Sequence, residues 1–301
     1  HMTNFVMYHY IKDFSKKSKY SDIKGLEVKL FEEQIKSLKK RFEIISIEQF
    51  LTKDYDSKIE TCVLTFDDGY KEHYTLANEI LNKYKLKGAF YVPVDVIEKK
   101  TLLDVNKVHI LLSQKNENIL LNRLKFHYNK ISENSNLDKI IESIDTSSRY
   151  DNKETIILKK LLQTILPDKT RFDILNLLMN DFIEDSETDI ANTWYVNESE
   201  IKKMISIGMH FGSHGKSHLR FSHLSRKDQE NEIKSSFNFL DKMYENKKYL
   251  KTICYPYGDF NNDTLDLLTE NNIKLGLTTI PEQFKEKSDM RTVPRFDTND
   301  F

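Results

Sequence analysis

The sequence predicts an α/β protein built on a parallel sheet or barrel. Short apolar segments typical of strands alternate with amphipathic helical segments over residues 5–92, and the alternation returns over residues 197–296. Such alternation is typical of parallel strands, because each helix crosses back to start the next strand. Between these regions strand signals are scarce, and amphipathic helical patterns follow one another. We therefore expect a barrel formed by residues 3–96 and 190–301, and a helical insertion over residues 97–189.

The composition is that of a water-soluble protein. Of the 301 residues, 39% are hydrophobic and 31% are charged, and the mean hydropathy is -0.59. No apolar run approaches the roughly 20 residues that a transmembrane helix needs. A net charge of -1 with mixed signs argues against a nucleic-acid or anionic-lipid partner. No charged and then apolar leader precedes the first strand, so we expect a cytoplasmic protein. The sequence does not indicate its oligomeric state.

The first part of the barrel is expected to contain strands rich in β-branched and aromatic residues, namely 5–8, 42–47, 62–66 and 89–92. Two segments between them carry apolar residues at helical spacing. The first is 28–41, with Leu30, Phe31, Ile35 and Leu38 on one face. The second is 71–85, which we expect to end at Gly88.

The remaining elements follow from the same signals. In the insertion, four segments are amphipathic, namely 105–112, 119–128, 155–166 and 172–183. After it, Asn197 with Glu200 predicts a capping box and a helix to Gly208, and Ser225 predicts the start of a helix reaching about Glu245. The later strands are expected at 209–213, 252–255, 275–280 and 291–296. Both cysteines, Cys62 and Cys254, lie in apolar strands and are expected to be buried thiols.

Two adjacent carboxylates, Asp67 and Asp68, end the strand 62–66, and Gly69 allows a sharp turn after them. Adjacent side chains at the end of a strand point in different directions. One carboxylate can therefore bind a metal while the other stays free as a base. This motif alone leaves open the alternative of a solvated Asp-Asp-Gly turn.

Two histidines four residues apart, His214 and His218, follow the strand 209–213. They can converge on one ion if the segment turns helically, and imidazole suits zinc and neighbouring first-row metals. Together with Asp68 they would leave coordination positions open for water and substrate, which is typical of catalytic zinc sites. The pair alone is a weak signal. Its combination with the Asp-Asp turn at another strand end favours a catalytic metal site.

These residues make the chain resemble the polysaccharide deacetylases, the NodB-homology group also called carbohydrate esterase family four. Residues 65–69, Thr-Phe-Asp-Asp-Gly, reproduce one family motif almost letter for letter. His214 and His218 match its His-x-x-x-His motif, although Gly215 stands where a serine or threonine is usual. Residues 256–258, Pro-Tyr-Gly, match a third motif. The resemblance covers the chain outside the insertion and implies a distorted (β/α) barrel of about seven strands.

The resemblance also implies roles for these residues. Asp67 would be the general base, and Asp68, His214 and His218 would bind a divalent metal, with zinc expected first and cobalt, nickel or manganese as alternatives. The backbone N–H of Tyr257 would help to hold the oxyanion. This agrees with the chemistry, because a carboxylate beside a metal can accept a proton from the attacking water. The metal and a backbone donor can stabilise the negative tetrahedral intermediate.

The chain departs from the family pattern at two places. The arginine that often orients the base is replaced by Cys254, and we expect Arg295 or Arg291 to supply its charge. The general acid, usually a histidine near the C-terminus, is missing there. However, residues 6–9, Val-Met-Tyr-His, resemble permuted members, including poly-N-acetylglucosamine deacetylases, in which this strand and histidine come first. His9 is therefore the candidate acid for the leaving amine.

The sequence thus predicts a metal-dependent deacetylase that hydrolyses the N-acetyl group of an amino sugar in surface polysaccharide or glycolipid biosynthesis. The expected cytoplasmic location favours a nucleotide-linked or lipid-linked sugar over a finished polymer, and the insertion would act as a lid. One alternative is hydrolysis of another amide, such as a formyl group or a cyclic imide. Another is an inactive sugar-binding protein on the same scaffold, which Cys254 and Gly215 motivate.

Overall fold

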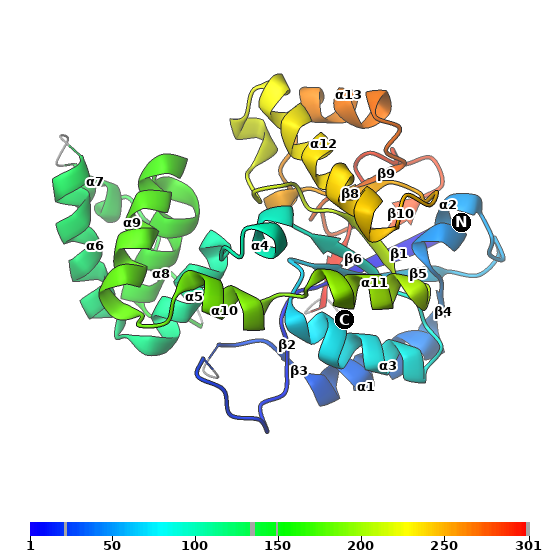
Figure 1. The fold of residues 1–301 in the computed structure, drawn as a ribbon, viewed down its shortest axis with the longest axis horizontal. Helices are drawn as coiled ribbons and strands as arrows, with labels where there is room; N and C mark the ends of the chain where they lie inside the picture. Colours follow the sequence, from blue (N-terminus) through cyan, green and yellow to red (C-terminus); the bar gives the residue numbers. More distant parts are fainter. Residues whose placement is uncertain (21–22, 133–135, 149, 299–301) are drawn as a thin grey trace. The chain divides into compact units, whose positions relative to one another are not determined.

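A computed structural model describes residues 1–20, 23–132, 136–148 and 150–298 of the chain. The internal contacts divide the chain into two compact units. The first consists of residues 1–13, 25–101 and 191–301, and the second of residues 14–24 and 102–190. Among the described residues, all strands belong to the first unit (Figure 1).

The first unit is built on a curled, largely parallel sheet. Its strands along the main path, in spatial order, are β10 (Phe284–Lys285), β1 (Met2–Tyr8), β5 (Thr61–Asp67), β6 (Ala89–Val92), β7 (His210–Ser213), β8 (Thr252–Cys254) and β9 (Leu275–Leu277). Neighbours from β1 to β9 pair in parallel, whereas β10 is antiparallel to β1. The short β4 (Glu43–Ile44) pairs with β5, and β2 (Ile11–Lys12) pairs with β3 (Leu26–Glu27). The predicted α/β fold is confirmed.

The two ends of this sheet are linked by one segment near the C-terminus. Val293 forms an isolated parallel bridge with Leu277 of β9. Three residues later, β11 (Phe296–Asp297) pairs in parallel with β1, where Phe296 is opposite Val6. Residues 293–297 therefore contact both the first and the last parallel strand. The sheet curls into the distorted barrel expected from the sequence.

Helices lie around the sheet, and their starts follow local sequence signals (Figure 1). The bounds in the first unit are α1 (Val28–Arg41), α2 (Ile47–Thr52), α3 (Asn78–Lys83), α4 (Val94–Glu98), α11 (Glu198–Ser206), α12 (Arg226–Met243) and α13 (Asn262–Glu270). The predicted capping box of Asn197 and Glu200 is confirmed at the start of α11. The predicted cap is also confirmed at α12, where Ser225 accepts a hydrogen bond from the Asp228 amide.

Some element predictions were wrong in detail. The expected strand 42–47 is reduced to β4, because Ser46 and Gln49 form a capping box that starts α2. The helix expected over 71–85 includes a π-helical turn, His73–Ala77, and its last helical residue is Lys83 rather than one next to Gly88. Leu30, placed on the buried face of α1, is 59% exposed.

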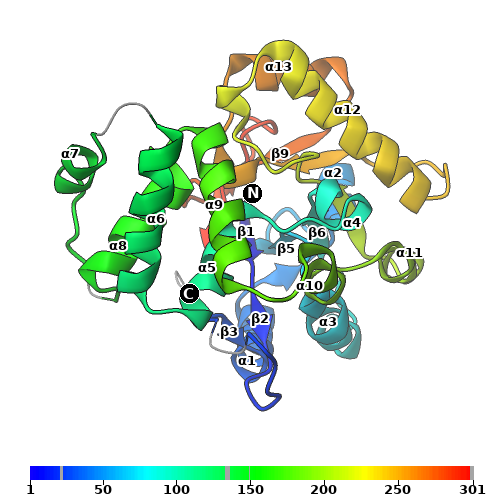
Figure 2. The ribbon, with the colours of Figure 1, turned by 60° about the vertical axis from the view of Figure 1, so that its left-hand side comes forward.

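The regular elements among the described residues of the second unit are helices, and α6 lies beside both α8 and α9 (Figure 2). Its helices are α5 (Asp104–Gln114), α6 (Glu117–Ile131), α7 (Leu137–Glu142), α8 (Lys153–Lys160), α9 (Asp168–Phe182) and the first half of α10 (Glu187–Trp194). The four amphipathic segments predicted there overlap α5, α6, α8 and α9. On α9, Leu175 and Leu178 are fully buried, whereas Phe172, which fits the same apolar face of the segment 172–183 by its spacing, is 51% exposed.

No helix among the described residues is both long and apolar enough to cross a membrane. The prediction for the cysteines is confirmed, because Cys62 and Cys254 are both buried free thiols.

Candidate active site

The polar residues singled out in the sequence meet at the carboxyl ends of the parallel strands. Asp67 is the last residue of β5 and Asp68 follows it, while His9, His214 and Tyr257 follow β1, β7 and β8. Catalytic residues of (β/α) barrels lie at this end of the strands. The sheet topology therefore brings together residues that are far apart in the sequence.

Asp68, His214 and His218 form a compact group of candidate metal ligands. The Nε2 atoms of His214 and His218 lie 3.1 Å and 3.3 Å from Asp68 Oδ1. One ligand atom from each residue lies within 4.8 Å of the others, and all three residues are buried. Two imidazoles and a carboxylate are suitable ligands for zinc and related cations, and three protein ligands leave room for water or substrate.

Neighbouring groups orient these ligands. His214 Nδ1 lies 2.7 Å from the carbonyl oxygen of Cys254. Because a carbonyl only accepts, Nδ1 carries the proton, and Nε2 keeps its lone pair for a metal. The Tyr70 hydroxyl donates to Asp68 Oδ2 at 3.1 Å, which leaves Oδ1 facing the histidines. The residues present thus fit a divalent cation. Sequence reasoning missed this role of Tyr70, although its place two residues after Asp68 in the motif could have indicated it.

The segment 214–218 is not helical. The prediction that His214 and His218 converge through a helical turn was therefore wrong. Gly215 has a φ of +75° and His218 a φ of +56°, both in the left-handed region. Two left-handed residues turn the backbone sharply enough to bring both imidazoles to Asp68. A non-glycine residue rarely takes such a φ, so His218 is held in an unfavourable conformation.

Asp67 lies beside this group and forms a buried bidentate pair with Arg295. Nη1 and Nη2 of Arg295 are each 2.8 Å from one carboxylate oxygen of Asp67. Arg295 also donates to the Thr278 carbonyl at 2.8 Å and to Thr65 Oγ1 at 3.0 Å. Burial acts to raise the pKa of Asp67, but the charge and hydrogen bonds of Arg295 outweigh burial and hold this pKa well below its ordinary value.

Of the two arginines proposed from the sequence, only Arg295 contacts Asp67. Arg291 pairs instead with Asp289 at 3.0 Å, and both side chains are partly exposed. Arg295 reaches the site because residues 293–297 connect β9 with β1. No local sequence signal distinguishes the two arginines.

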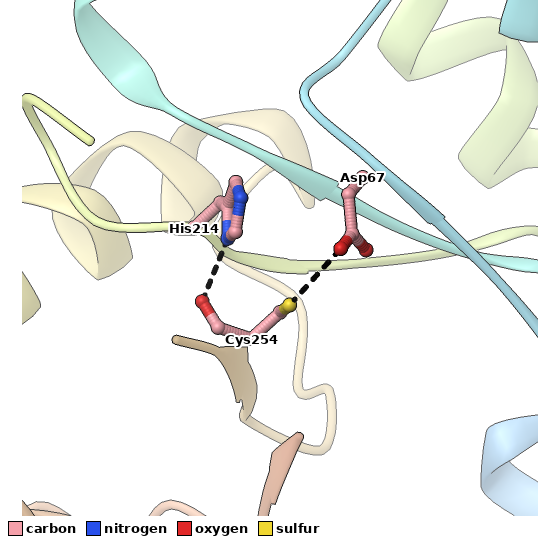
Figure 3. A group of neighbouring side chains, drawn as sticks. All are labelled: Asp67, His214 and Cys254. Carbon is pink, nitrogen blue, oxygen red and sulfur yellow. Dashed lines mark hydrogen bonds between the residues drawn. The ribbon is translucent and has the colours of Figure 1, made fainter. Parts of the chain in front are cut away.

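A second group, Asp67, His214 and Cys254, also brings possible metal-binding atoms together (Figure 3). Cys254 Sγ is 3.5 Å from Asp67 Oδ2 and 3.1 Å from Arg295 Nη2. The guanidinium therefore already occupies the place beside Asp67 and Cys254 where a cation would lie. His214 also directs its proton-bearing Nδ1 toward Cys254. For these reasons the group with Asp68 is the better candidate metal site.

His9 and Tyr257 complete the set. His9 Nε2 lies 3.6 Å from Asp67 Oδ2, and 43% of the His9 side chain is exposed. Tyr257 has a left-handed φ of +60°, and its ring centre is 4.8 Å from that of His218. The guanidinium of Arg220 lies over the Tyr257 ring, 3.8 Å from the ring centre. All the predicted site residues therefore lie near one another in the first unit.

A curled parallel sheet with paired carboxylates and histidines at its strand ends defines a distorted (β/α) barrel with a candidate catalytic site at the carboxyl ends of its strands. The chain belongs to the polysaccharide deacetylase family, since the model of that family matches residues 54–114 and 182–276, just over half of the chain.

Known proteins agree with this assignment. The chain is 28% identical to YxkH of Bacillus subtilis over 92 residues, which are 31% of this chain and 32% of that protein. The match therefore spans about a third of this relative. The fold is similar to that of the Streptococcus pyogenes deacetylase PplD, solved with acetate, with a TM-score of 0.60, 18% identity and coverage of 98% of this chain and 92% of that one. IcaB of Ammonifex degensii gives a TM-score of 0.57 and 14% identity, covering 99% and 91%.

Proposed function

We propose that the chain is a metal-dependent deacetylase that hydrolyses the N-acetyl group of an amino sugar in surface polysaccharide or glycolipid biosynthesis. The observation that carries this proposal is the pair of adjacent carboxylates in different environments. Asp68 faces two imidazoles, whereas Asp67 is paired with a buried arginine. One carboxylate is thus suited to bind a cation and the other to accept a proton.

Asp68, His214 and His218 would hold the divalent metal, for which zinc is the first candidate and cobalt, nickel and manganese are alternatives. When bound, such a cation polarises the acyl carbonyl and makes a water molecule more acidic. His214 is prepared for this role, because the Cys254 carbonyl fixes its tautomer.

The chain's own residues would move the protons. Asp67, kept ionised by Arg295, accepts a proton from the attacking water while the new C–O bond forms. His9, 3.6 Å from Asp67, donates a proton to the leaving nitrogen as the C–N bond breaks. The backbone N–H of Tyr257 donates to the oxyanion. The products are acetate and a free amine.

The comparisons support acetyl as the acyl group that is removed. PplD was solved with acetate, and a de-N-acetylase of Aggregatibacter actinomycetemcomitans shares the fold with a TM-score of 0.54, at 14% identity and with coverage of 98% of this chain and 94% of that one. Arg295 also weakens the alternative of an inactive sugar-binding protein, because it provides beside Asp67 the charge that Cys254 lacks. A comparison of N-acetyl with N-formyl substrates decides between this proposal and the hydrolysis of another amide, such as a formyl group. We further propose that the helical insertion limits the size of the substrate.

The test combines metal content with acetate release, for N-acetylglucosamine oligomers, nucleotide-linked N-acetyl sugars and N-formyl analogues. Asp68→Ala should lose the metal and all activity. Asp67→Asn should keep the metal but lose about 10²–10⁴-fold in rate, the usual contribution of a general base. The exposed Asp54→Asn is the control and should match the wild type. A wild-type protein that holds no metal and releases no acetate would refute the proposal.

A further inference from the structure

Helix α12 places two buried polar side chains next to the segment that carries both candidate histidine ligands. Glu232 and Ser236 are 6% and 0% exposed, on a helix that also buries apolar residues such as Ile233 and Leu240. They are four residues apart and therefore lie on the same face of the helix. Buried polar groups are costly unless they form hydrogen bonds, so their partners indicate what they do.

Ser236 contacts the beginning of the segment. Its Oγ lies 2.7 Å from the Ile233 carbonyl, to which it donates, and 2.6 Å from Ser213 Oγ. A hydroxyl has one proton, so Ser213 is the donor in the second bond. Ser213 Oγ in turn accepts from the Gly215 amide at 3.1 Å. These bonds hold the backbone on both sides of His214.

Glu232 contacts the end of the same segment. Its Oε1 accepts from the Ser217 amide at 2.9 Å, and its Oε2 lies 3.1 Å from Ser217 Oγ. Asp95 Oδ2 is also 3.1 Å from this hydroxyl. However, Glu232 receives the backbone amide as well, and Asp95 already has Lys216 Nζ at 3.1 Å from its other oxygen. Glu232 is therefore the main anchor of the residue that precedes His218.

The spacing on the helix matches the spacing on the segment. Ser213 and Ser217 each come one residue before a histidine, and they are four residues apart like Ser236 and Glu232. The segment itself is not regular, because Gly215 and His218 have positive φ values. A His in this conformation needs outside contacts to stay there.

From these contacts we propose that Glu232 and Ser236 are positioning residues that set the distance between His214 and His218 before any metal binds. This inference rests on the proposed function for its purpose, namely metal binding. Glu232 contributes more to this positioning than Ser236, because it accepts hydrogen bonds from both the amide and the hydroxyl of Ser217.

The first test measures the Zn²⁺ dissociation constant by calorimetry. Glu232→Ala should weaken Zn²⁺ binding by about 10-fold or more, as other losses of ligand-orienting groups do. Glu232→Gln should stay close to the wild type, because its amide oxygen can still accept from the Ser217 amide. The matched control is Gln229→Ala on the same helix. Gln229 is buried and bonded to Thr264 and Asn261, so its loss should lower the Tm without changing the Zn²⁺ affinity.

The second test uses metal-free protein and amide hydrogen exchange. The Ser217 amide should be protected in the wild type and in Glu232→Gln, and should exchange faster in Glu232→Ala than in Gln229→Ala. Equal exchange in the two alanine variants, or equal Zn²⁺ affinity in Glu232→Ala and the wild type, overturns the inference. If the wild type binds no Zn²⁺, the proposed metal site fails, and the exchange measurement still decides whether Glu232 holds the segment.

Discussion

Arg295 has no exposed surface and donates hydrogen bonds to both oxygens of Asp67. Removing one partner of a buried ion pair leaves the other charge without compensation, which is more costly than never burying the pair. The pair therefore links the proposed base to the stability of the whole sheet. Its two members come from β5 and from the segment just before β11.

We expect Arg295→Met to lower the free energy of unfolding by about 3–5 kcal/mol, the usual cost of breaking a buried pair. Asp67→Asn removes the same pair, so the double variant should lose less than the sum of the two single changes. Urea denaturation of the four proteins measures this coupling.

The control for this cycle is Arg291→Met. The ion pair of Arg291 is with Asp289, and both side chains are partly exposed. Loss of the Arg291 charge should therefore change the free energy of unfolding little. Additive effects of Arg295→Met and Asp67→Asn would contradict a direct interaction between these residues.

Strand β7 shows how an element depends on close packing rather than on side-chain chemistry. A Cβ atom placed on Gly212 would lie 2.4 Å from the Tyr91 ring and 2.7 Å from the Thr252 carbonyl oxygen. One of these neighbours is backbone of β8 and cannot rotate away. The glycine therefore allows β7 to approach β6 and β8 closely, directly before His214.

Gly212→Ala should destabilise the protein by about 1–3 kcal/mol, the typical cost of overpacking a core. The shift of β8 should also disturb the Cys254 carbonyl that orients His214, so Zn²⁺ binding should weaken in the folded variant. Thermal denaturation and zinc titration check both effects. A variant with wild-type stability would show that the strands can separate without cost.

At the scale of the whole molecule, the second unit has its own polar link between helices. Asp181 of α9 accepts from Arg123 Nε at 2.8 Å, and its Oδ2 lies 2.6 Å from His127 Nε2, both on α6. The hydrogen bond from Arg123 lowers the pKa of Asp181, burial opposes this effect, and His127 adds to the lowering. The unit thus gains stability from an ionised Asp181.

Asp181→Asn should lower the free energy of unfolding by up to about 1 kcal/mol at pH 7, since the pair is partly exposed. A lowered pKa in the folded state means that this stability is present above the unfolded pKa, about 3.9, and is lost as the pH falls through the folded pKa. The difference between variant and wild type should therefore shrink below about pH 4. Denaturation at several pH values measures it.

Asp173→Asn is the control on the same helix, because Asp173 pairs with Lys169, which is 87% exposed. It should have a smaller effect with little pH dependence. Zn²⁺ affinity should be unchanged in both variants, because the candidate ligands all belong to the first unit. A loss of Zn²⁺ affinity in Asp181→Asn would contradict this independence.

Local sequence determined much of this protein. The α/β alternation and the capping box of Asn197 and Glu200 followed from patterns within a few residues, and so did the two motifs that carry Asp68 and the histidine pair His214 and His218. Such patterns are readable because caps, turns and motif residues act on their immediate neighbours. Burial was less predictable: Leu30 and Phe172 fit an apolar face by spacing but are exposed.

The tertiary structure alone decided which arginine pairs with Asp67 and what holds the histidine segment. Arg295 and Asp67 are 228 residues apart, and they meet because residues 293–297 join the two ends of the curled sheet. Glu232 contacts Ser217 because α12 packs beside the segment that follows β7, and this packing brings the two residues within hydrogen-bonding distance. Contacts of this kind depend on how the sheet curls and how helices pack on it, and no short stretch of sequence contains that information.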